Sequence, residues 1–321
     1  MSASEKPNTL IADQNTGRTA DKSERDSTSG NRHLIRLGFA IAALCAAFAV
    51  PLWQLFRFCL HSQLFSYILL VPAISGYVFW TERAKLQVSK PWTPMAGVLA
   101  VIALGCIGAY WGFVRGHADL SQADRLAPIV LSFVLLVQAA GAMVLGRTGM
   151  RGAAFPLLFL LFMVPLPAVV EHGFTAFLQH ASAETAYFLI KMSGLPILRE
   201  GTLFQLPGIN MEVAPECSGI RSTMVLILTS FLAGHLFLKR IWTRSALVAA
   251  VIVLGILRNG FRILVLAQLC VQISPTMIDS PIHHRGGPVF FALSLIPLLA
   301  LIWYFRKIEK RSPTPVGLPK E

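Results

Sequence analysis

The chain has 321 residues, of which 55% are hydrophobic and only 14% are charged. This balance excludes an ordinary soluble domain and predicts an all-α polytopic membrane protein, with membrane lipid as its main surroundings. The net charge of +12 would suggest nucleic acid in a soluble protein. Here most Lys and Arg residues lie in short runs between apolar segments, where they fix membrane orientation, so we expect no nucleic-acid partner.

Residues 1–33 are polar, mixed in charge and rich in Ser, Thr and Asn. This composition predicts a disordered cytoplasmic tail. The tail shows neither the charged n-region nor the cleavage site of a removable signal peptide, so we expect the first span to act as an uncleaved anchor.

Eight apolar segments approach the length of about 20 residues that a membrane-spanning helix needs. They lie at residues 35–56, 63–81, 93–114, 126–146, 153–170, 217–238, 245–268 and 287–305. We therefore expect one eight-span membrane domain over residues 34–305, followed by a cytoplasmic tail over residues 306–321. In the fifth segment, Pro156, Pro165 and Pro167 are expected to bend or shorten the helix.

Positive charge recurs before the first span and after each even-numbered one. The residues are Arg32 and Arg36, then Arg83, Lys85 and Lys90, then Arg147 and Arg151, then Lys239, Arg240 and Arg244, and finally Arg306, Lys307, Lys310 and Arg311. The positive-inside rule then predicts that both termini are cytoplasmic and that the opposite loops face outward.

The longest connection between spans, residues 171–216, belongs to the outward side in this arrangement. Its first part repeats apolar residues at helical spacing from Phe174 to Met192, which predicts an amphipathic helix along the outer interface. Its second part alternates apolar and polar residues over 209–213 after the turn pair Pro207-Gly208. We expect a short β-hairpin in which residues 202–206 form the other strand.

The five cysteines contain no CxxC pair, so the sequence predicts neither a zinc site nor a redox motif, and we expect no metal or cofactor. Cys45 and Cys106 fall within apolar runs and are expected to be inert core residues. Cys59 and Cys270 lie near span ends and could form a disulfide on an oxidising side of the membrane, which the sequence alone does not decide.

Cys217 has a different setting, because it begins the sixth predicted span at the outward side. A thiol attacks only as thiolate, and its ordinary pKa of about 8.5 must fall for reaction near neutral pH. The positive end of a helix dipole would favour the thiolate, and Ser218-Gly219 would let a substrate backbone approach.

Two other outward segments carry groups that thiol chemistry requires. His283 or His284, before the eighth span, would serve as general acid and base. Arg262, near the outer end of the seventh span, would stabilise an oxyanion or orient the substrate carbonyl. Asn259 is a further possible site residue, because an amide is difficult to assign to lipid.

Each of these residues also has a simpler explanation. A cysteine near a helix end is commonly a packing residue, and adjacent histidines in a loop are commonly solvated. Arg258 and Arg262 lie four residues apart on one helical face and could both extend toward the membrane interface. However, Arg258 lies deep enough in its span to need a polar partner.

At these residues the sequence resembles the exosortase/archaeosortase family of membrane transpeptidases. The resemblance covers residues 35–305. It depends on Glu216-Cys217-Ser218-Gly219-Ile220-Arg221-Ser222, on Asn259-x-x-Arg262-Ile263, and on His283 four residues before Gly287 with Val289-Phe290-Phe291 following. The ordered set of Cys, Arg and His implies Cys217 as nucleophile, Arg262 as carbonyl or oxyanion stabiliser, and His283 as general acid/base. His284 stands where an acidic residue is frequent in the family, which leaves open which imidazole is the base.

The resemblance implies a multi-pass enzyme of the bacterial inner membrane with a periplasmic active site. Its substrates would be exported proteins that end in a short motif such as Pro-Glu-Pro, a transmembrane helix and a basic cluster. It would cleave at the motif through a thioester acyl-enzyme and transfer the product to an unknown acceptor, often in organisms that make exopolysaccharide. Arg221 or Arg258 would hold a glutamate of the motif.

Two other function classes remain open from the sequence. In a polytopic transporter, the arginines and histidines would line a pathway and Cys217 would be incidental. In a non-catalytic assembly factor for envelope polysaccharide, no residue would act as a nucleophile. We find no internal repeat that would favour a transporter.

Overall fold

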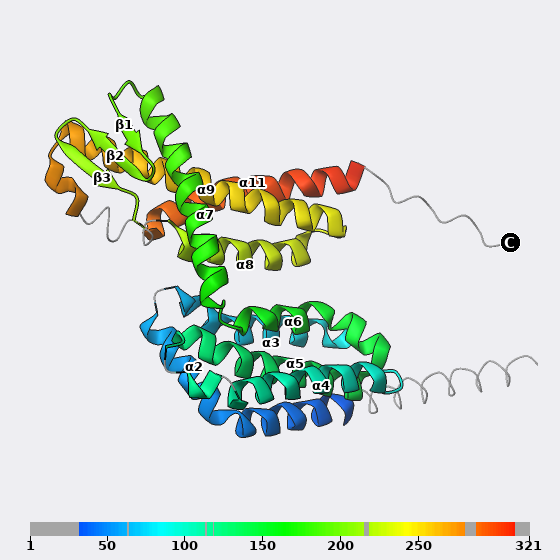
Figure 1. The fold of residues 1–321 in the computed structure, drawn as a ribbon. Coiled ribbons are helices and arrows are strands. Elements are labelled where there is room, and N and C mark those ends of the chain that lie inside the picture. Colours follow the sequence, from blue (N-terminus) through cyan, green and yellow to red (C-terminus); the bar gives the residue numbers. More distant parts are fainter. Residues whose placement is uncertain are drawn as a thin grey trace, which may run out of the picture. The chain divides into compact units, whose positions relative to one another are not determined.

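A computed structural model of the chain describes residues 32–62, 64–112, 114–117, 119–214, 218–279 and 287–311. The chain divides into two compact units. Unit 1 comprises residues up to 62 together with residues 68–166, and unit 2 comprises residues 63–67 together with the chain from residue 167 onward. Figure 1 shows the helices and strands of both units.

Unit 1 is a bundle of α-helices joined by short 3₁₀-helices. Its α-helices are Arg32–Ala47, α2 (Ala49–His61), α3 (Leu70–Glu82), α4 (Thr93–Gly112), α5 (Gln122–Gly152) and α6 (Ala154–Phe159). The 3₁₀-helices are η2 (Arg83–Lys85), η3 (Val114–Gly116) and η4 (Leu160–Met163), and η1 (Phe65–Leu69) crosses the boundary between the units.

Unit 2 combines long α-helices with a small antiparallel sheet. Its elements are α7 (Ala168–Met192), β1 (Leu198–Glu200), β2 (Leu203–Leu206), β3 (Ile209–Glu212), α8 (Ile220–Phe237), α9 (Ile241–Gln272), η6 (Pro275–Asp279) and α11 (Gly287–Arg311). In Figure 1, α8, α9 and α11 lie side by side, and the sheet lies near the C-terminal ends of α7 and α9.

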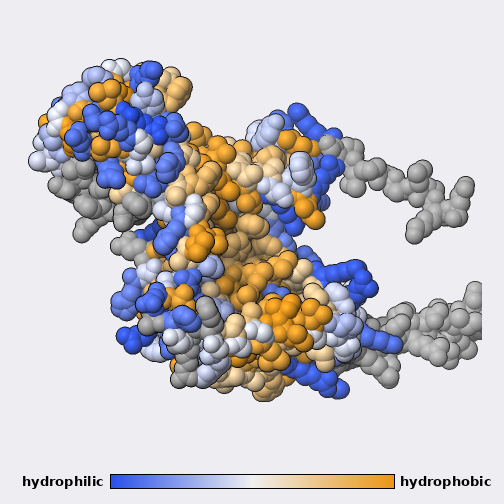
Figure 2. All heavy atoms as spheres, in the orientation of Figure 1, coloured by the Kyte–Doolittle hydropathy of each residue, from blue (hydrophilic) through white to orange (hydrophobic). Residues whose placement is uncertain are grey.

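The predicted fold class, an all-α polytopic membrane protein with a small β-hairpin, is confirmed. Within the described residues, five helices are long and apolar enough to cross a membrane, and two bent helix pairs raise the number to seven. Figure 2 shows hydrophobic side chains along the flanks of the helices and polar ones toward their ends, as a lipid environment requires.

The structure differs from the expected eight spans in two places. Over residues 63–81, the α-helical part is α3, which has 13 residues. Over residues 153–170, the chain forms α6 and η4, and after a break α7 begins at Ala168. Pro165 and Pro167 lie in this break, and Pro167 is the N-cap residue of α7. The expected shortening of the helix is therefore present, because proline cannot continue a helix from the preceding turn.

In unit 1, the segment after α3 contacts a kink in α5. The Ser89 amide donates to the Leu145 carbonyl at 3.1 Å, and the Ser89 hydroxyl accepts from the Thr148 amide at 3.0 Å. At the kink, Gly146 has φ +68°, and a Cβ there would collide with the Lys90 carbonyl. Two of the predicted basic connections, after the second and fourth expected spans, therefore lie at one end of unit 1.

The predicted hairpin is confirmed, and the structure adds a third strand, β1. Strands β2 and β3 pair antiparallel, with Leu206 opposite Ile209 across the Pro207-Gly208 turn. Proline at the first central position and Gly208 at φ +80° at the second fit a type II turn. Strand β1 pairs with the other side of β2, which gives the order β1-β2-β3.

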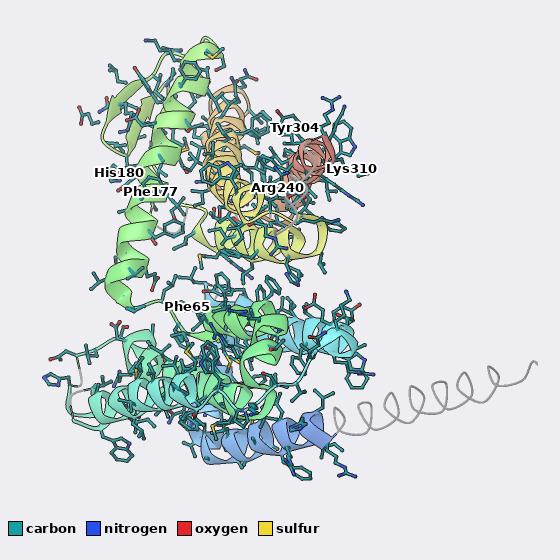
Figure 3. The ribbon with its side chains drawn as sticks, turned by 90° about the vertical axis from the view of Figure 1, so that its right-hand side faces the viewer. Phe65, Phe177, His180, Arg240, Tyr304 and Lys310 are labelled. Atoms are coloured by element: carbon teal, nitrogen blue, oxygen red, sulfur yellow. The ribbon has the colours of Figure 1, made fainter. Side chains whose placement is uncertain are left out.

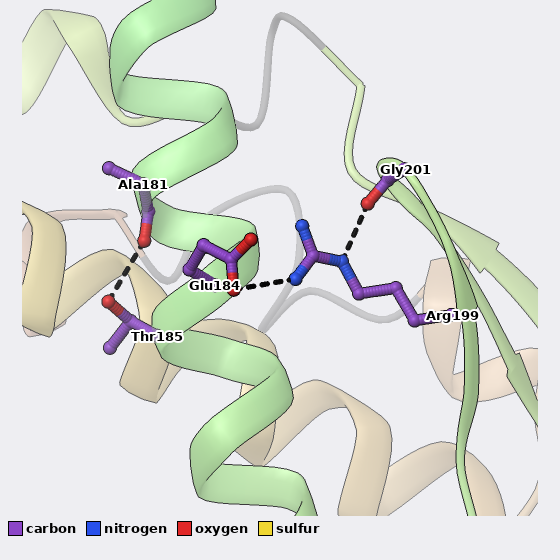
Figure 4. Close-up of polar contacts among 5 residues, drawn as sticks. All are labelled: Ala181, Glu184, Thr185, Arg199 and Gly201. Atoms are coloured by element: carbon purple, nitrogen blue, oxygen red, sulfur yellow. Dashed lines mark hydrogen bonds and ion pairs between the residues drawn. The ribbon is translucent and has the colours of Figure 1, made fainter.

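The sheet shares one buried core with α7 and α9. The core comprises Ala183, Ala186 and Ile190 of α7, Phe204, Leu206, Met211 and Val213 of the hairpin, and Ile263, Leu266, Ala267 and Cys270 of α9. Polar contacts reinforce it (Figure 4): Arg199 forms a 2.8 Å ion pair with Glu184 and donates to the Gly201 carbonyl at 2.7 Å. Gln179 donates to the Val213 carbonyl at 2.5 Å. Thus α7 and α9 both fix the strand from which the chain continues toward Cys217.

At the opposite end of unit 2, a carboxylate of α11 joins the turn between α8 and α9. Glu309 accepts hydrogen bonds from the backbone amides of Lys239, at 2.9 Å, and of Arg240, at 2.9 Å, and from the Thr243 hydroxyl. These contacts satisfy amides at the N-terminus of α9 and place a negative charge at the positive end of its dipole. They bring together the basic clusters that end the sixth and eighth expected spans, and Arg240 and Lys310 lie on the same side in Figure 3.

Candidate functional site

Helix α9 carries most of the described candidate residues in one turn and a half. Arg258 and Asn259 are buried, with exposed fractions of 9% and 2%, and Arg262 is half-buried. Two glycines in the same part of α9, Gly255 and Gly260, let the neighbouring helices approach closely. A Cβ at Gly255 would lie 2.8 Å from the Thr223 hydroxyl of α8, and one at Gly260 would lie 2.5 Å from Thr185 of α7. Small residues in apolar helices permit such contact.

The Arg258 guanidinium crosses from α9 to the start of α8. Its Nη2 donates to the Ser222 hydroxyl at 2.5 Å and to the Gly219 carbonyl at 3.5 Å. The Ser222 hydroxyl in turn donates to the same carbonyl at 3.0 Å. The idea that both arginines extend toward the membrane interface is therefore wrong for Arg258, whose polar partners lie inside the protein. The expectation that Arg258 needs a partner is confirmed.

The first residues of α8 are held against Asn259. Gly219 is the N-cap residue and has φ +76°, a left-handed conformation that favours glycine. A Cβ there would lie 3.0 Å from Cγ of Asn259 and 3.2 Å from Nη2 of Arg258. Ser218 is also buried, and its hydroxyl accepts from the Ile220 amide at 3.4 Å. The contact between Gly219 and Asn259 therefore leaves no room for a side chain at this position.

The start of α11 lies beside the same part of α9. The rings of Phe261 and Phe290 meet edge to face with centroids 6.4 Å apart. Phe290 is three residues after Gly287, where α11 begins, and Phe261 lies between Asn259 and Arg262. Three segments that are distant in the sequence, the starts of α8 and α11 and the 258–262 part of α9, thus converge at one end of unit 2.

The predicted catalytic set is only partly described. Arg262 lies in α9, whereas Cys217, His283 and His284 lie outside the described residues. Helix α8 begins at Ile220, three residues after Cys217. Of the predicted substrate-binding residues, Arg258 is buried as described, and Arg221 is exposed in the first turn of α8.

The structure describes the surroundings of the other four cysteines. Cys45, Cys59, Cys106 and Cys270 are all free thiols. Cys270 is buried in the shared core, whereas Cys45 is exposed, so the core interpretation of Cys45 is wrong. In the part of the chain that the structure describes, no group of three or more His, Cys, Asp or Glu side chains could hold a metal ion.

Sequence reasoning missed the polar contacts that hold the start of α8. Ser222 and the carbonyl of Gly219 were not expected to bind Arg258, and Gly255 and Gly260 were not recognised as close-contact positions. A signal existed for the glycines, because each interrupts an apolar helix at a cost of roughly 1 kcal/mol relative to alanine. The partner of Arg258 could not be deduced, because helix rotation and crossing decide which side chain it meets.

The comparisons with known proteins give one finding. The model of the transmembrane exosortase family (Exosortase_EpsH) matches residues 59–300. No curated protein and no solved structure matches the chain. The match covers most of the chain, including every segment that converges at this end of unit 2, and the chain therefore belongs to the transmembrane exosortase family.

Proposed function

We propose that the protein is a cysteine-type sorting transpeptidase whose site lies where the starts of α8 and α11 meet α9. In this proposal Cys217 is the nucleophile, Arg262 stabilises the oxyanion, and His283 is the general acid/base. The substrates are exported proteins that end in a short motif such as Pro-Glu-Pro, a transmembrane helix and a basic cluster. The site faces the periplasm of a bacterial inner membrane, and no cofactor takes part.

The observation that carries the proposal is the convergence of the three segments. Cys217 precedes buried Ser218 directly, so their Cα atoms are about 3.8 Å apart, and a Cβ added to Gly219 would lie only 3.0 Å from Cγ of Asn259. His283 is four residues before Gly287, a chain length of at most about 14 Å. Both candidate groups therefore belong to segments that end beside the turns of α9 that carry Arg262.

The electrostatic setting of the α8 start supports a thiolate. Backbone amides at a helix N-terminus present partial positive charge, equivalent to about half a proton charge for a long helix. The buried Arg258 guanidinium adds a full charge within hydrogen-bond distance of the Gly219 carbonyl. Together they favour an anion near the residues that precede α8.

In the reaction, the Cys217 sulfur forms a bond to the scissile carbonyl carbon, and its proton passes to the imidazole. Arg262 donates hydrogen bonds to the developing oxyanion. The C–N bond then breaks, the imidazole returns the proton to the leaving amine, and a thioester remains. An acceptor nucleophile attacks the thioester and restores the thiol. Arg258 or Arg221 would hold a carboxylate of the motif, Arg258 through its Nη1.

Buried Arg258 Nη1 makes no hydrogen bond within the described residues. A buried donor without a partner costs about 1–3 kcal/mol, so this nitrogen suits a carboxylate or carbonyl that the substrate brings. The rival function, transport through a pathway lined by the same arginines, requires no nucleophile. Removal of the Cys217 sulfur should therefore abolish the peptidase function but would leave transport intact.

The test uses an exported reporter that carries the C-terminal motif, helix and basic cluster of a protein from the same genome. Cys217→Ala and Cys217→Ser should leave the reporter at full length. His283→Ala should also leave it at full length, whereas His284→Ala should still cleave it. Processing by the Cys217→Ala variant would overturn the nucleophile assignment. Processing by His283→Ala but not His284→Ala would move the base by one residue.

The proposed orientation has a separate test. A cysteine introduced in the connection between α9 and α11, for example Thr276→Cys, should react with a membrane-impermeant maleimide added to intact spheroplasts. The control is Arg306→Cys at the basic end of α11, which should react only after the membrane is broken. The opposite labelling pattern would place the site in the cytoplasm.

A further inference from the structure

Strand β3 is an edge strand, and its hydrogen-bonding direction is fixed by the hairpin register. The Val213 amide donates to the Thr202 carbonyl at 3.0 Å, so the backbone groups of Val213 face β2. Because backbone direction alternates along an antiparallel strand, the N–H and C=O groups of Asn210 and Glu212 face away from β2. These two residues form an outward row beyond the last strand of the order β1-β2-β3.

The outward row has the properties of an open pairing edge. Within the described residues, no hydrogen bond reaches the backbone groups of Asn210 or Glu212, and both side chains are exposed. The pairing with β2 is continuous over 209–212, without a bulge, and β3 contains neither proline nor lysine. Natural edge strands use bulges, proline, charged side chains or very short length to prevent pairing with another chain. Strand β3 has four residues and carries the charge of Glu212, but without a bulge or a proline its outward groups can still accept a short strand.

This edge is also rigid and directly connected to the proposed nucleophile. Met211 and Val213 are buried in the core shared with α7 and α9, and Gln179 binds the Val213 carbonyl. Glu212 is five residues before Cys217, and at about 3.3 Å per residue the chain between them spans at most roughly 17 Å. A peptide on the edge can therefore reach the thiol with a segment of similar length.

We propose that the extended segment of the substrate beside the scissile bond adds to β3 as a fourth strand. The proposal rests on the proposed peptidase function and names how the same site binds its substrate. Backbone hydrogen bonds would supply affinity that does not depend on sequence, and alternate side chains would supply specificity. A peptide fits this edge better than a lipid chain does, because the outward row offers two N–H donors and two carbonyl acceptors.

Disulfide trapping tests the pairing without depending on turnover. In a Cys217→Ala background, Asn210→Cys and Glu212→Cys are each combined with a cysteine scanned along the extended segment of the reporter described above. In paired strands directly opposite Cβ atoms lie about 4.5–5.5 Å apart. We expect trapping at one reporter position for each variant, with the preferred position shifted by two residues between them.

A control places the cysteine on the opposite edge of the sheet. Leu198→Cys in β1 lies on the same exposed face and should not trap the reporter. Trapping without a two-residue shift, equal trapping by Leu198→Cys, or disulfides between two copies of this chain would each overturn the proposal. Because the variants carry no Cys217, trapping still occurs if that residue is not the nucleophile. Failure of the pairing and failure of the proposed function are thus separate results.

A second variant removes the donors of the outward row. Asn210→Pro and Glu212→Pro delete N–H groups that do not belong to the β2–β3 ladder, so the hairpin is retained. With Cys217 intact, each should slow reporter processing about two- to tenfold, the effect of one hydrogen bond. Asn210→Thr and Glu212→Thr keep the N–H and should process at the wild-type rate. Equal slowing by the threonine variants would show that the side chains, and not the edge, are responsible.

Discussion

Two arginines of α9 contact opposite ends of α8, and their electrostatic settings differ. Arg244 donates to the Leu238 carbonyl through Nε, at 3.0 Å, and Nη2, at 2.8 Å. This contact places a cation at the C-terminus of α8, where unsatisfied carbonyls and the helix dipole favour it. Arg258 places its cation at the N-terminus of α8, where the dipole disfavours it. Arg244 thus stabilises the fold, whereas Arg258 creates a positive site that an anion would stabilise.

The same contrast extends to the acidic side chains at the two ends. At the Arg244 end, Glu309 is held by two backbone amides and a hydroxyl, so its charge is satisfied within the protein. At the Arg258 end, the described residues provide hydroxyl and carbonyl oxygens but no salt bridge to Arg258. The two ends of α8 therefore differ within the described residues: a carboxylate lies at the Arg244 end, whereas neutral oxygens bind the cation at the Arg258 end.

Among changes that compare the two ends of α8, the largest expected effect comes from removing the Arg258 charge. Arg258→Leu should reduce reporter processing by roughly 10- to 150-fold, the loss of a charge-assisted hydrogen bond of about 1.5–3 kcal/mol. Arg244→Leu, in the same helix, should lower thermal stability in nanodiscs while the processing rate at low temperature stays near wild type. If the two variants lose processing equally, the contrast between the two ends of α8 is wrong.

The contact between α8 and α9 should also tolerate an added methyl group less well at the Arg258 end than at the Arg244 end. Gly255→Ala would press a methyl group against Thr223 at 2.8 Å and should reduce the free energy of unfolding by about 1–3 kcal/mol. The matched change at the other end is Gly234→Ala, where the nearest side-chain atom, Cγ of Arg244, lies 3.6 Å away. That variant should be neutral or slightly stabilising. Heat inactivation of the purified protein measures both, and a reversed order would contradict the close contact at Gly255.

Removal of the Ser222 hydroxyl should have an intermediate effect. Ser222→Ala leaves Nη2 of Arg258 with only the long contact to the Gly219 carbonyl. Loss of the hydrogen bond to the hydroxyl should cost about 1–2 kcal/mol, which slows processing about five- to thirtyfold. Ser222→Thr keeps the hydroxyl and should recover most of the activity. Reporter cleavage over time measures the rate, and heat inactivation tells whether stability is unchanged. Loss of stability without a change in rate would give Ser222 a purely structural role.

The smallest expected effect concerns Glu309. Glu309→Gln keeps an oxygen acceptor but removes the charge at the N-terminus of α9, which should cost about 0.5–1 kcal/mol of stability and leave processing unchanged. Heat inactivation and reporter cleavage measure the two quantities. A large loss of processing would mean that the basic end also takes part in the reaction.

Much of this fold could be predicted from local patterns in the sequence. The hairpin follows from alternation at 209–213 and from Pro207-Gly208, because the period and the turn residues specify it together. The long helices follow from apolar length. Strand β1 was missed because three residues that include Arg199 and Glu200 carry no hydrophobic alternation, and it forms through pairing with β2 and the ion pair to Glu184.

The candidate site could be predicted in composition but not in arrangement. The positions of the basic residues between apolar spans and the spacing of the motif placed Arg258, Asn259 and Arg262 in one helical segment. The contact of Arg258 with Ser222 depends on how α9 rotates against α8, which Gly255 and Thr223 determine together. No local pattern encodes such a contact, because Ser222 and Arg258 are 36 residues apart in the sequence.

The hairpin exit and the N-cap of α8 together limit how the intervening chain can evolve. Val213 is bound by Gln179 and Thr202, and Gly219 is bound by Arg258, so the connection of residues 214–218 runs between two fixed attachment points. Adding or deleting one residue there would change the reach of the connection by about 3.5 Å, more than the tolerance of a reacting pair. Under the proposed function, the number of residues in this connection should therefore be as constrained as the identity of Cys217.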